Sequence, residues 1–388
     1  MLGDRLLGDS SSATTAYSDP VRERIVASIA TAVLPHAADW EELGYIPPEG
    51  WRALAEQGLL AFPHSGPGFM RSAILLEELG RTGYAGVRAA VAVNAFMASS
   101  YVANFGTPDQ RERYLPAVRR GERIAALALS ESGAGTDLQS ITTSAEPDGS
   151  DGYRVSGQKL HVANGSQAGF YVCLARIRTI ATRPRTLGGC GLLIIDADSP
   201  GLTATAQPML GWRAADVCQV TLDDVYVPNG RLIGRAGYTA SHLMKALDFE
   251  RLVAGLLAVG GAVHCVVTAC SFARIHRVND APLASNQAVR HTLADLAAEL
   301  DLVRAYAYQA AVRHSQGRLD SRVASILKLR ATELAVSAAR VCLQYHGAHG
   351  YLEDSVAARI YRDAAAGTIT AGPSEIMREL IFEMTELI

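Results

Sequence analysis

The sequence lacks the patterns that mark several large classes of protein. Its six cysteines are scattered and form no CxxC pair, and its 36 basic residues are balanced by 39 acidic ones without any block of like charge. Scattered cysteines are typical of buried apolar positions rather than of a disulfide framework or a zinc site. The charge balance argues against a nucleic-acid-binding protein. We therefore predict a protein of a reducing compartment, the cytoplasm, without a metal site.

Motifs for membrane insertion, export and nucleotide binding are also missing. The stretch that comes nearest to a membrane span, 246–267, is interrupted by charged residues that include Glu250 and Arg251. Residues 1–18 are polar and rich in serine and threonine, without the apolar core of a signal peptide, and we expect them to be flexible. No GxGxxG motif follows a predicted strand and no GxxxxGK[ST] motif occurs, so neither a Rossmann nor a P-loop nucleotide site is expected.

What is present is a change of periodicity along the chain. Apolar residues recur at helical spacing within 19–121, short alternating segments fill 122–236, and helical spacing returns in 237–388. The expected strands are 124–129, 153–162, 170–176, 190–195, 202–206 and 217–227, and the expected helices include 48–58, 71–81 and 85–104. We therefore predict an α+β fold with a flexible N-terminus (1–18), an N-terminal α-helical domain, a middle β-domain of sandwich or barrel type and a C-terminal four-helix bundle.

The stretch 127–137 joins a predicted strand to a turn that holds Gly133 and Gly135. Glycines allow a backbone to turn sharply and to approach a ligand closely. The hydroxyl groups of Ser130 and Thr136 beside them could hydrogen-bond a polar heterocycle or an acyl group. An ordinary surface turn would use the same residues, so these residues alone leave both interpretations open.

Glu250 and Arg251 stand out because they interrupt an apolar helical stretch. A carboxylate on an apolar face is costly unless it is paired or functional. One interpretation is that Glu250 faces solvent or pairs with an arginine elsewhere in the chain. The other is that Glu250 is a general base whose pKa is raised by burial beside a substrate.

Several ordered motifs resemble those of one family, the acyl-CoA dehydrogenases, over nearly the whole chain. Residues 130–137 (SESGAGTD) are similar to the family's TEPGAGSD, and residues 157–165 (GQKLHVANG) are similar to NGQKxWITNG. Residues 344–351 (QYHGAHGY) resemble QxxGGxGY, residues 361–364 read YRDA, and residues 372–376 (GPSEI) resemble GTSEI. Each motif is weak alone, but their order and spacing together are specific.

The resemblance implies a homotetrameric or homodimeric flavoprotein that binds FAD and introduces an α,β double bond into an acyl thioester. By matching positions, Leu129 and Ser130 would contact the isoalloxazine edge, and Thr136 would lie near the carrier of the thioester. Gln344 and Gly347 would reach the FAD of a neighbouring subunit. The carrier would be CoA or an acyl-carrier protein, and the electron acceptor an electron-transfer flavoprotein or oxygen.

The catalytic base is the informative departure from most of the family. Most members have a glutamate directly before the glycine of the last motif, where this chain has Ala371. The isovaleryl-CoA and long-chain acyl-CoA dehydrogenases instead carry the base within an ERL sequence, and residues 249–253 read FERLV here. The resemblance therefore favours Glu250 as the base that removes the α-proton, with Leu247 and Arg251 beside the substrate.

Three positions of the expected FAD site differ from the family pattern. The family's tryptophan beside the flavin is His161, and the hydroxyl residue that hydrogen-bonds flavin N5 is Ala163. In the motif that starts with Arg277, the aromatic residue that packs on a neighbouring FAD is Asp280. Loss of one neutral hydrogen bond weakens a site by roughly 0.5–1.5 kcal/mol. We therefore expect a dehydrogenase with a specialised biosynthetic role. The alternatives are a flavin-dependent oxygenase on the same fold and a non-catalytic homologue.

Overall fold

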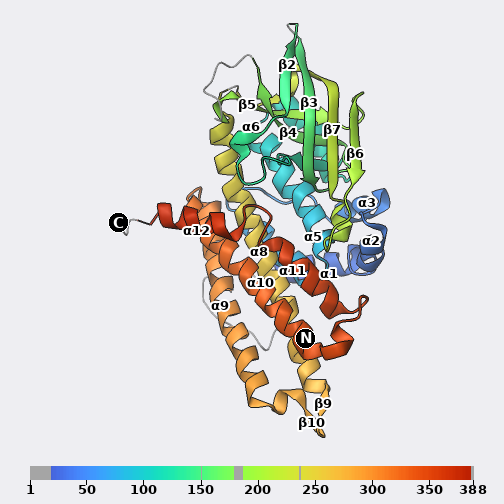
Figure 1. The fold of residues 1–388 in the computed structure, drawn as a ribbon, viewed down its shortest axis with the longest axis vertical. Helices are drawn as coiled ribbons and strands as arrows, with labels where there is room; N and C mark the ends of the chain where they lie inside the picture. Colours follow the sequence, from blue (N-terminus) through green and yellow to red (C-terminus); the bar gives the residue numbers. More distant parts are fainter. Residues whose placement is uncertain (1–18, 150, 179–186, 236, 386–388) are drawn as a thin grey trace. The chain divides into compact units, whose positions relative to one another are not determined.

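The computed structural model describes residues 19–149, 151–178, 187–235 and 237–385, and the N-terminal stretch expected to be flexible lies outside them. The chain forms two compact units (Figure 1). Within the described residues the first unit consists of 19–34, Phe62–Arg88 and 251–385, and the second consists of Pro35–Ala61 and Ala89–Glu250. The division into domains at 121 and 236 stays a prediction.

The second unit is built on one mixed sheet. Its strands are β1 (Ala125–Ala128), β2 (Ser144–Asp148), β3 (Gly152–Val162), β4 (Phe170–Ile177), β5 (Cys190–Asp196), β6 (Leu202–Ala206), β7 (Cys218–Pro228) and β8 (Leu232–Ile233). The strand order is β6-β7-β3-β2-β4-β5-β8, and β1 pairs with β4. The pairs of β4 with β1 and with β2 are parallel, and the other pairs are antiparallel.

Successive side chains along the strands point to opposite faces of the sheet and contribute to two separate hydrophobic clusters. Phe170, Val172 and Leu174 of β4 pack with helical residues in one cluster. Tyr171 and Cys173, which point to the opposite face, pack in another cluster with inward-facing valines of β3 and β7. The period of two along a strand produces this split. The expected middle β-domain is confirmed, and one of its faces is covered by helices.

In the second unit, two strands and one helix were not expected from the sequence. β2 contains Pro147 and Asp148, residue types that are depleted in strands, and it is held by its antiparallel pairing with β3. β8 has only two residues. The unexpected helix is α2 (Ala37–Leu43), which is too short for a clear helical period.

Three further helices belong to the second unit. They are α3 (Pro48–Glu56), α6 (Ser99–Phe105) and α7 (Pro108–Arg119). The single helix expected over 85–104 is interrupted, because α5 (Ala85–Ala92) and α6 are joined by a π-helical turn at Val93–Ala98. The side chain of Asn94 in this turn accepts a hydrogen bond from the Ala125 amide at 2.8 Å, which fixes the turn to the start of β1.

The first unit is helical. Its helices are α1 (Asp19–Ala32), α4 (Phe69–Arg81), α9 (Gln287–Ser315), α10 (Ser321–Gly350), α11 (Val356–Gly367), α12 (Ser374–Glu383) and the greater part of α8 (Thr239–Ile275), with a small hairpin of β9 (Arg277–Val278) and β10 (Ala281–Pro282). Asn286, Asp320 and Ser355 cap the N-termini of α9, α10 and α11 by accepting backbone hydrogen bonds. The C-terminal helical bundle is thus confirmed.

Helix α8 is long and apolar enough to cross a membrane by composition, but most of its apolar window is buried within the protein. Gly260 of α8 lies so close to α4 that an added Cβ would come within 2.0 Å of the Glu77 carbonyl oxygen. The absence of a side chain at Gly260 therefore allows α8 and α4 to pack closely. All six cysteines are free, and only Cys270 is not fully buried.

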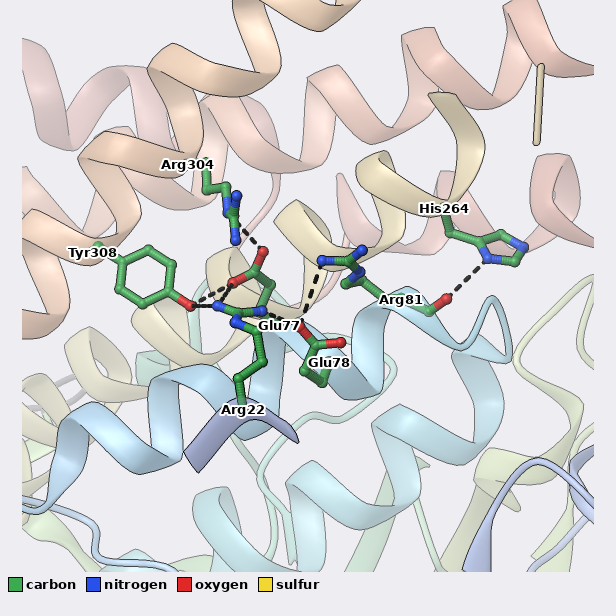
Figure 2. A network of polar contacts seen from close by, with 7 residues as sticks. All are labelled: Arg22, Glu77, Glu78, Arg81, His264, Arg304 and Tyr308. Carbon is green, nitrogen blue, oxygen red and sulfur yellow. Dashed lines mark hydrogen bonds and ion pairs between the residues drawn. The ribbon is translucent and has the colours of Figure 1, made fainter. Parts of the chain in front are cut away.

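A buried carboxylate joins three helices of the first unit, as Figure 2 shows. Glu77 of α4 is fully buried and forms ion pairs with Arg22 of α1 at 2.9 Å and with Arg304 of α9 at 2.8 Å. Tyr308 also donates to Glu77. Burial alone would raise the pKa of Glu77, but the guanidinium groups of Arg304 and Arg22 outweigh it and lower the pKa. The carboxylate therefore stays ionised as the common partner of these helices.

We predict that Glu77→Gln destabilises the protein by about 3 kcal/mol, because it leaves two largely buried guanidinium groups without their counter-charge. The measurement is chemical denaturation followed by circular dichroism. The matched control is Glu299→Gln, which removes a partly exposed pair with Arg330 at 2.6 Å and should cost at most about 1 kcal/mol. Equal effects of the two variants would contradict a special role for the buried carboxylate.

Candidate active site

The glycine-bearing turn after β1 presents an open edge. Leu129 is buried and Ser130 half-buried, while Gly133, Gly135 and Thr136 are exposed. Among the residues that the structure describes, none other than the adjoining residues of the chain comes within 4 Å of a Cβ built on either glycine, so the space beside the turn is open. The turn is held from within, because residues 131 and 134 exchange two backbone hydrogen bonds of 3.2 and 3.0 Å. A rigid backbone with hydroxyl groups thus borders free space.

A buried ion pair supports this turn from behind. The ammonium group of Lys159 on β3 donates to Glu131 Oε1 at 2.8 Å and to the Leu129 carbonyl at 3.0 Å. The same carboxylate accepts hydrogen bonds from the Thr142 amide and hydroxyl and from the Thr143 amide. Lys159 is fully buried and Glu131 nearly so. The pair therefore joins the end of β1 to β3 and to the segment before β2.

The electrostatics of this pair favour the charged forms. Burial alone would raise the pKa of Glu131, but the hydrogen bonds from Lys159 and Thr143 outweigh it, and the pKa falls to about 2. Glu131 is thus ionised at every physiological pH. It balances Lys159 and acts as a structural group rather than as a proton acceptor.

The glycine-bearing turn forms one wall of the candidate site, and the turn at the end of β3 forms the second. The Leu160 amide donates to the Ser130 carbonyl at 2.9 Å, which brings the glycine-bearing turn alongside His161 and Ala163. His161 is exposed and has a φ of 58°, a left-handed conformation that is uncommon for a residue with a side chain. Asn164 holds the turn by donating from its side chain to the Ala90 carbonyl at 3.0 Å. The two walls predicted from the sequence are therefore adjacent.

Glu250 lies on α8, whose first turn is fastened to the sheet. The Thr239 hydroxyl donates to the Cys190 carbonyl of β5 at 2.7 Å. Ala246, one turn before Glu250, shares a core cluster with Leu129. Glu250 is only 5% exposed, and the Tyr101 hydroxyl of α6 donates to its Oε1 at 2.8 Å. The carboxylate is therefore buried in the unit that carries both walls, which excludes the interpretation that it faces solvent.

The other predicted site residues lie in different surroundings. Leu247 is half-buried on α8, and Arg251 is buried and belongs to the first unit. Gln344 and Gly347 are exposed at the end of α10, where Gly347 has a φ of 59° and interrupts the helix. Arg277 is exposed at the start of the small hairpin. The roles of these residues toward a substrate or a neighbouring FAD stay predictions.

The hairpin explains why an acid replaces the aromatic residue expected at position 280. Asn279 and Asp280 both have positive φ, 47° and 61°, and form the two-residue turn between β9 and β10. Such turns favour Asn, Asp and Gly because other side chains are strained there. Arg277 donates to the Asp280 carbonyl and closes the turn. Asp280 therefore meets a local backbone requirement.

Position 371, where the resemblance predicts the base of most family members, holds an alanine. Ala371 has a φ of 54°, and it precedes Gly372 at 96°. The buried Lys328 ammonium donates to the Gly372 carbonyl and fixes this turn before α12. Burial and the charge of Arg251 lower the pKa of Lys328 to about 8. A cation thus faces this turn.

The sequence reasoning did not single out Tyr101, Lys159 or Glu131. Lys159 could have been found, because it falls on the same strand face as Val155 and Gly157, at even spacing in a predicted strand. A lysine at such a position must be neutralised by a buried acid. Tyr101 gave no comparable signal, since a tyrosine within a helix is most often an ordinary core residue.

Comparison with known proteins identifies the family. Models of the acyl-CoA dehydrogenase N-terminal, middle and C-terminal domains match residues 16–122, 126–225 and 240–385. The long-chain specific acyl-CoA dehydrogenase of Mus musculus is 30% identical over 370 residues, 94% of this chain and 85% of that protein. The chain belongs to the acyl-CoA dehydrogenase family. The isovaleryl-CoA dehydrogenase of Oryza sativa subsp. japonica is 29% identical over 386 residues, 96% and 92% of the two chains. The crystal structure of an acyl-CoA dehydrogenase from Geobacillus kaustophilus, 30% identical, matches with a TM-score of 0.89 over 96% of this chain and 99% of that one.

Membership makes the protein an FAD-dependent oxidoreductase, with flavin-dependent dehydrogenation of acyl-CoA as its general activity. The second unit fits such a cofactor. Open space borders Gly133 and Gly135, and the half-buried Ser130 is held beside the turn that carries Ala163. A flat polar heterocycle needs a close backbone and a few polar groups of this kind.

We predict that Lys159→Met destabilises the protein by about 3–5 kcal/mol near neutral pH, because it leaves a buried carboxylate unpaired. The pKa of Glu131 is lowered from 4.5 to about 2, so its contribution is complete above pH 4.5 and is lost as the pH falls toward 2. The difference between wild type and variant should therefore narrow in acid.

Urea denaturation at a series of pH values measures this effect. The control is Lys245→Met, since Lys245 is exposed on α8 and its loss should change the free energy of unfolding by less than about 0.5 kcal/mol. A difference between Lys159→Met and wild type that does not depend on pH would contradict the assigned ion pair.

Proposed function

We propose that the enzyme dehydrogenates a saturated acyl thioester with Glu250 as the base that removes the α-proton. The observation that supports this most strongly is the burial of the Glu250 carboxylate in the unit that also holds the glycine-bearing turn and the His161 turn. Tyr101, which donates to Glu250, belongs to the same core cluster as Leu129 and Ala134. A general base has to lie within reach of the bound substrate, and this packing supports the proposal that Glu250 is that base.

In the proposed reaction, Glu250 accepts the α-proton and the thioester becomes α,β-unsaturated. When bound, FAD supplies the acceptor for the hydride that leaves the β-carbon. Leu129 and Ser130 would border its ring edge. The low exposure of Glu250 limits the access of water to its carboxylate. Ala371 provides no competing carboxylate.

The acyl group would lie between Leu247 on α8 and the helix that contains Tyr101, with Arg251 beside the reacting centre. Thr136, exposed at the open end of the glycine-bearing turn, would lie near the carrier of the thioester. That carrier is CoA or an acyl-carrier protein. The isovaleryl and long-chain names of the relatives support an acyl substrate and leave its length open.

We further propose that the protein acts in the cytoplasm. We also propose a homotetramer or homodimer, because Arg277, Gln344 and Gly347 match positions that reach a neighbouring subunit's FAD. The reduced flavin would pass electrons to an electron-transfer flavoprotein or to oxygen. His161 and Ala163 replace the family's tryptophan and hydroxyl residue, so a specialised biosynthetic substrate fits this flavin site better than a general fatty acid does.

We predict that Glu250→Gln lowers turnover roughly 10²- to 10⁴-fold, the usual contribution of a general base, while the purified protein keeps its flavin absorption spectrum. The assay is anaerobic dye reduction with saturated acyl-CoA thioesters of graded length and branching. The control is Glu112→Gln, an exposed carboxylate on α7, which should turn over like wild type.

Turnover of Glu250→Gln within a few-fold of wild type would exclude Glu250 as the base. A wild-type protein that leaves its flavin oxidised under all thioesters, yet consumes oxygen with an added reductase, would support the oxygenase alternative instead.

A further inference from the structure

Tyr101 forms a buried hydrogen bond with the proposed base. Its side chain is fully buried on α6, and its hydroxyl donates to Glu250 Oε1 at 2.8 Å. The two residues are 149 positions apart in the sequence, and both belong to the second unit. A hydrogen bond between a phenol and a carboxylate is charge-assisted and therefore stronger than a neutral one.

The ring of Tyr101 is held in place by its neighbours. The Phe105 ring lies edge-on to it at 6.4 Å between centroids. Phe105 in turn stacks on His242 of α8, with a centroid distance of 4.4 Å and an interplanar angle of 25°. Because His242 lies on the helix that carries Glu250, the ring contacts hold α6 against α8 at a second position, N-terminal to Glu250.

The backbone that carries Tyr101 is also fixed. The π-helical turn Val93–Ala98 ends three residues before it, and Asn94 in that turn is bonded to the first residue of β1. A π-helical turn adds a residue to one turn of helix and rotates everything that follows, and such turns are frequent at functional sites. This rotation sets which face of α6 points toward Glu250, and therefore whether Tyr101 contacts it.

We propose that Tyr101 is a positioning residue that orients the Glu250 carboxylate toward the α-carbon of the thioester. The proposal rests on the function assigned to Glu250 above. The bond engages Oε1 and so restricts rotation of the carboxylate about its last torsion. A carboxylate held in one orientation avoids the loss of rate that follows from a misplaced reacting group.

The bond has a second effect, on basicity. Burial, followed by the charge of Glu250, raises the pKa of Tyr101 well above 10, so the hydroxyl remains a donor at working pH. Hydrogen bonding to a carboxylate favours its ionised form. Tyr101 therefore keeps Glu250 ready to accept a proton, whereas burial alone would favour the protonated acid.

The test is Tyr101→Phe, which removes one hydroxyl and keeps the ring. We expect kcat to fall roughly ten- to hundredfold with KM changed less than about threefold, because orientation acts on the chemical step. In the dependence of kcat on pH, the midpoint of the fall in activity on the acid side should move to a higher pH by about one unit, because the ionised Glu250 loses a hydrogen-bond donor.

The chain offers a matched control in Tyr114→Phe. Tyr114 is also fully buried in the second unit, and its hydroxyl also donates to a carboxylate, Asp196, at 3.0 Å. This variant loses a comparable bond away from Glu250, so its kcat and acid limb should match wild type. Denaturation curves of both variants report whether the fold is kept.

Each outcome decides between roles. A normal kcat and acid limb in Tyr101→Phe overturn the positioning role while leaving the base assignment intact. Failure of Tyr101→Phe to fold, when Tyr114→Phe folds, assigns the bond to stability and also overturns it. If wild type turns over no thioester, or Glu250→Gln turns over like wild type, the proposed function and this inference fail together.

Discussion

The ammonium group of Lys159 holds together the part of the molecule on which the proposed chemistry depends. It is buried between the Leu129 carbonyl and the Glu131 carboxylate, so the strand that ends at Leu129 cannot separate from β3 without exposing an unpaired charge in the core. β3 continues into the turn that carries His161. The spacing of the two turns of the candidate site is therefore fixed by a lysine that lies behind them and need not touch a ligand.

The remaining site residues had to meet backbone requirements as well as chemical ones. Asp280 stands where the resemblance predicts an aromatic residue, and its positive φ in a two-residue turn accounts for an acid there. Ala371, at the position where the resemblance predicts the base of most family members, has a left-handed conformation. His161 shares that conformation, in an exposed position. Local geometry thus accounts for the acid at position 280, while Ala371 and the imidazole at 161 have no structural reason.

Periodicity and motifs were enough for the long helices and for most strands of the sheet, because these patterns lie in neighbouring residues. They also singled out the glycine-bearing turn and Glu250, whose roles stay predictions. They were insufficient for β2, whose pairing with β3 overrides the poor strand propensity of Pro147 and Asp148. They were also insufficient for Tyr101, which meets Glu250 through a π-helical turn and the packing of α6 on α8. Contacts that depend on the rotation of a helix cannot be predicted from the neighbouring residues in the sequence.

The most direct test of Glu250 as the base is the exchange of the α-proton of an acyl-CoA with solvent, measured by mass spectrometry in D₂O under anaerobic conditions. This exchange separates proton removal from electron transfer to the flavin. Wild-type protein with bound FAD is expected to place deuterium at the α-carbon, and Glu250→Gln to do so at least roughly 10²-fold more slowly. Exchange by the variant at the wild-type rate would contradict the assignment and require another base.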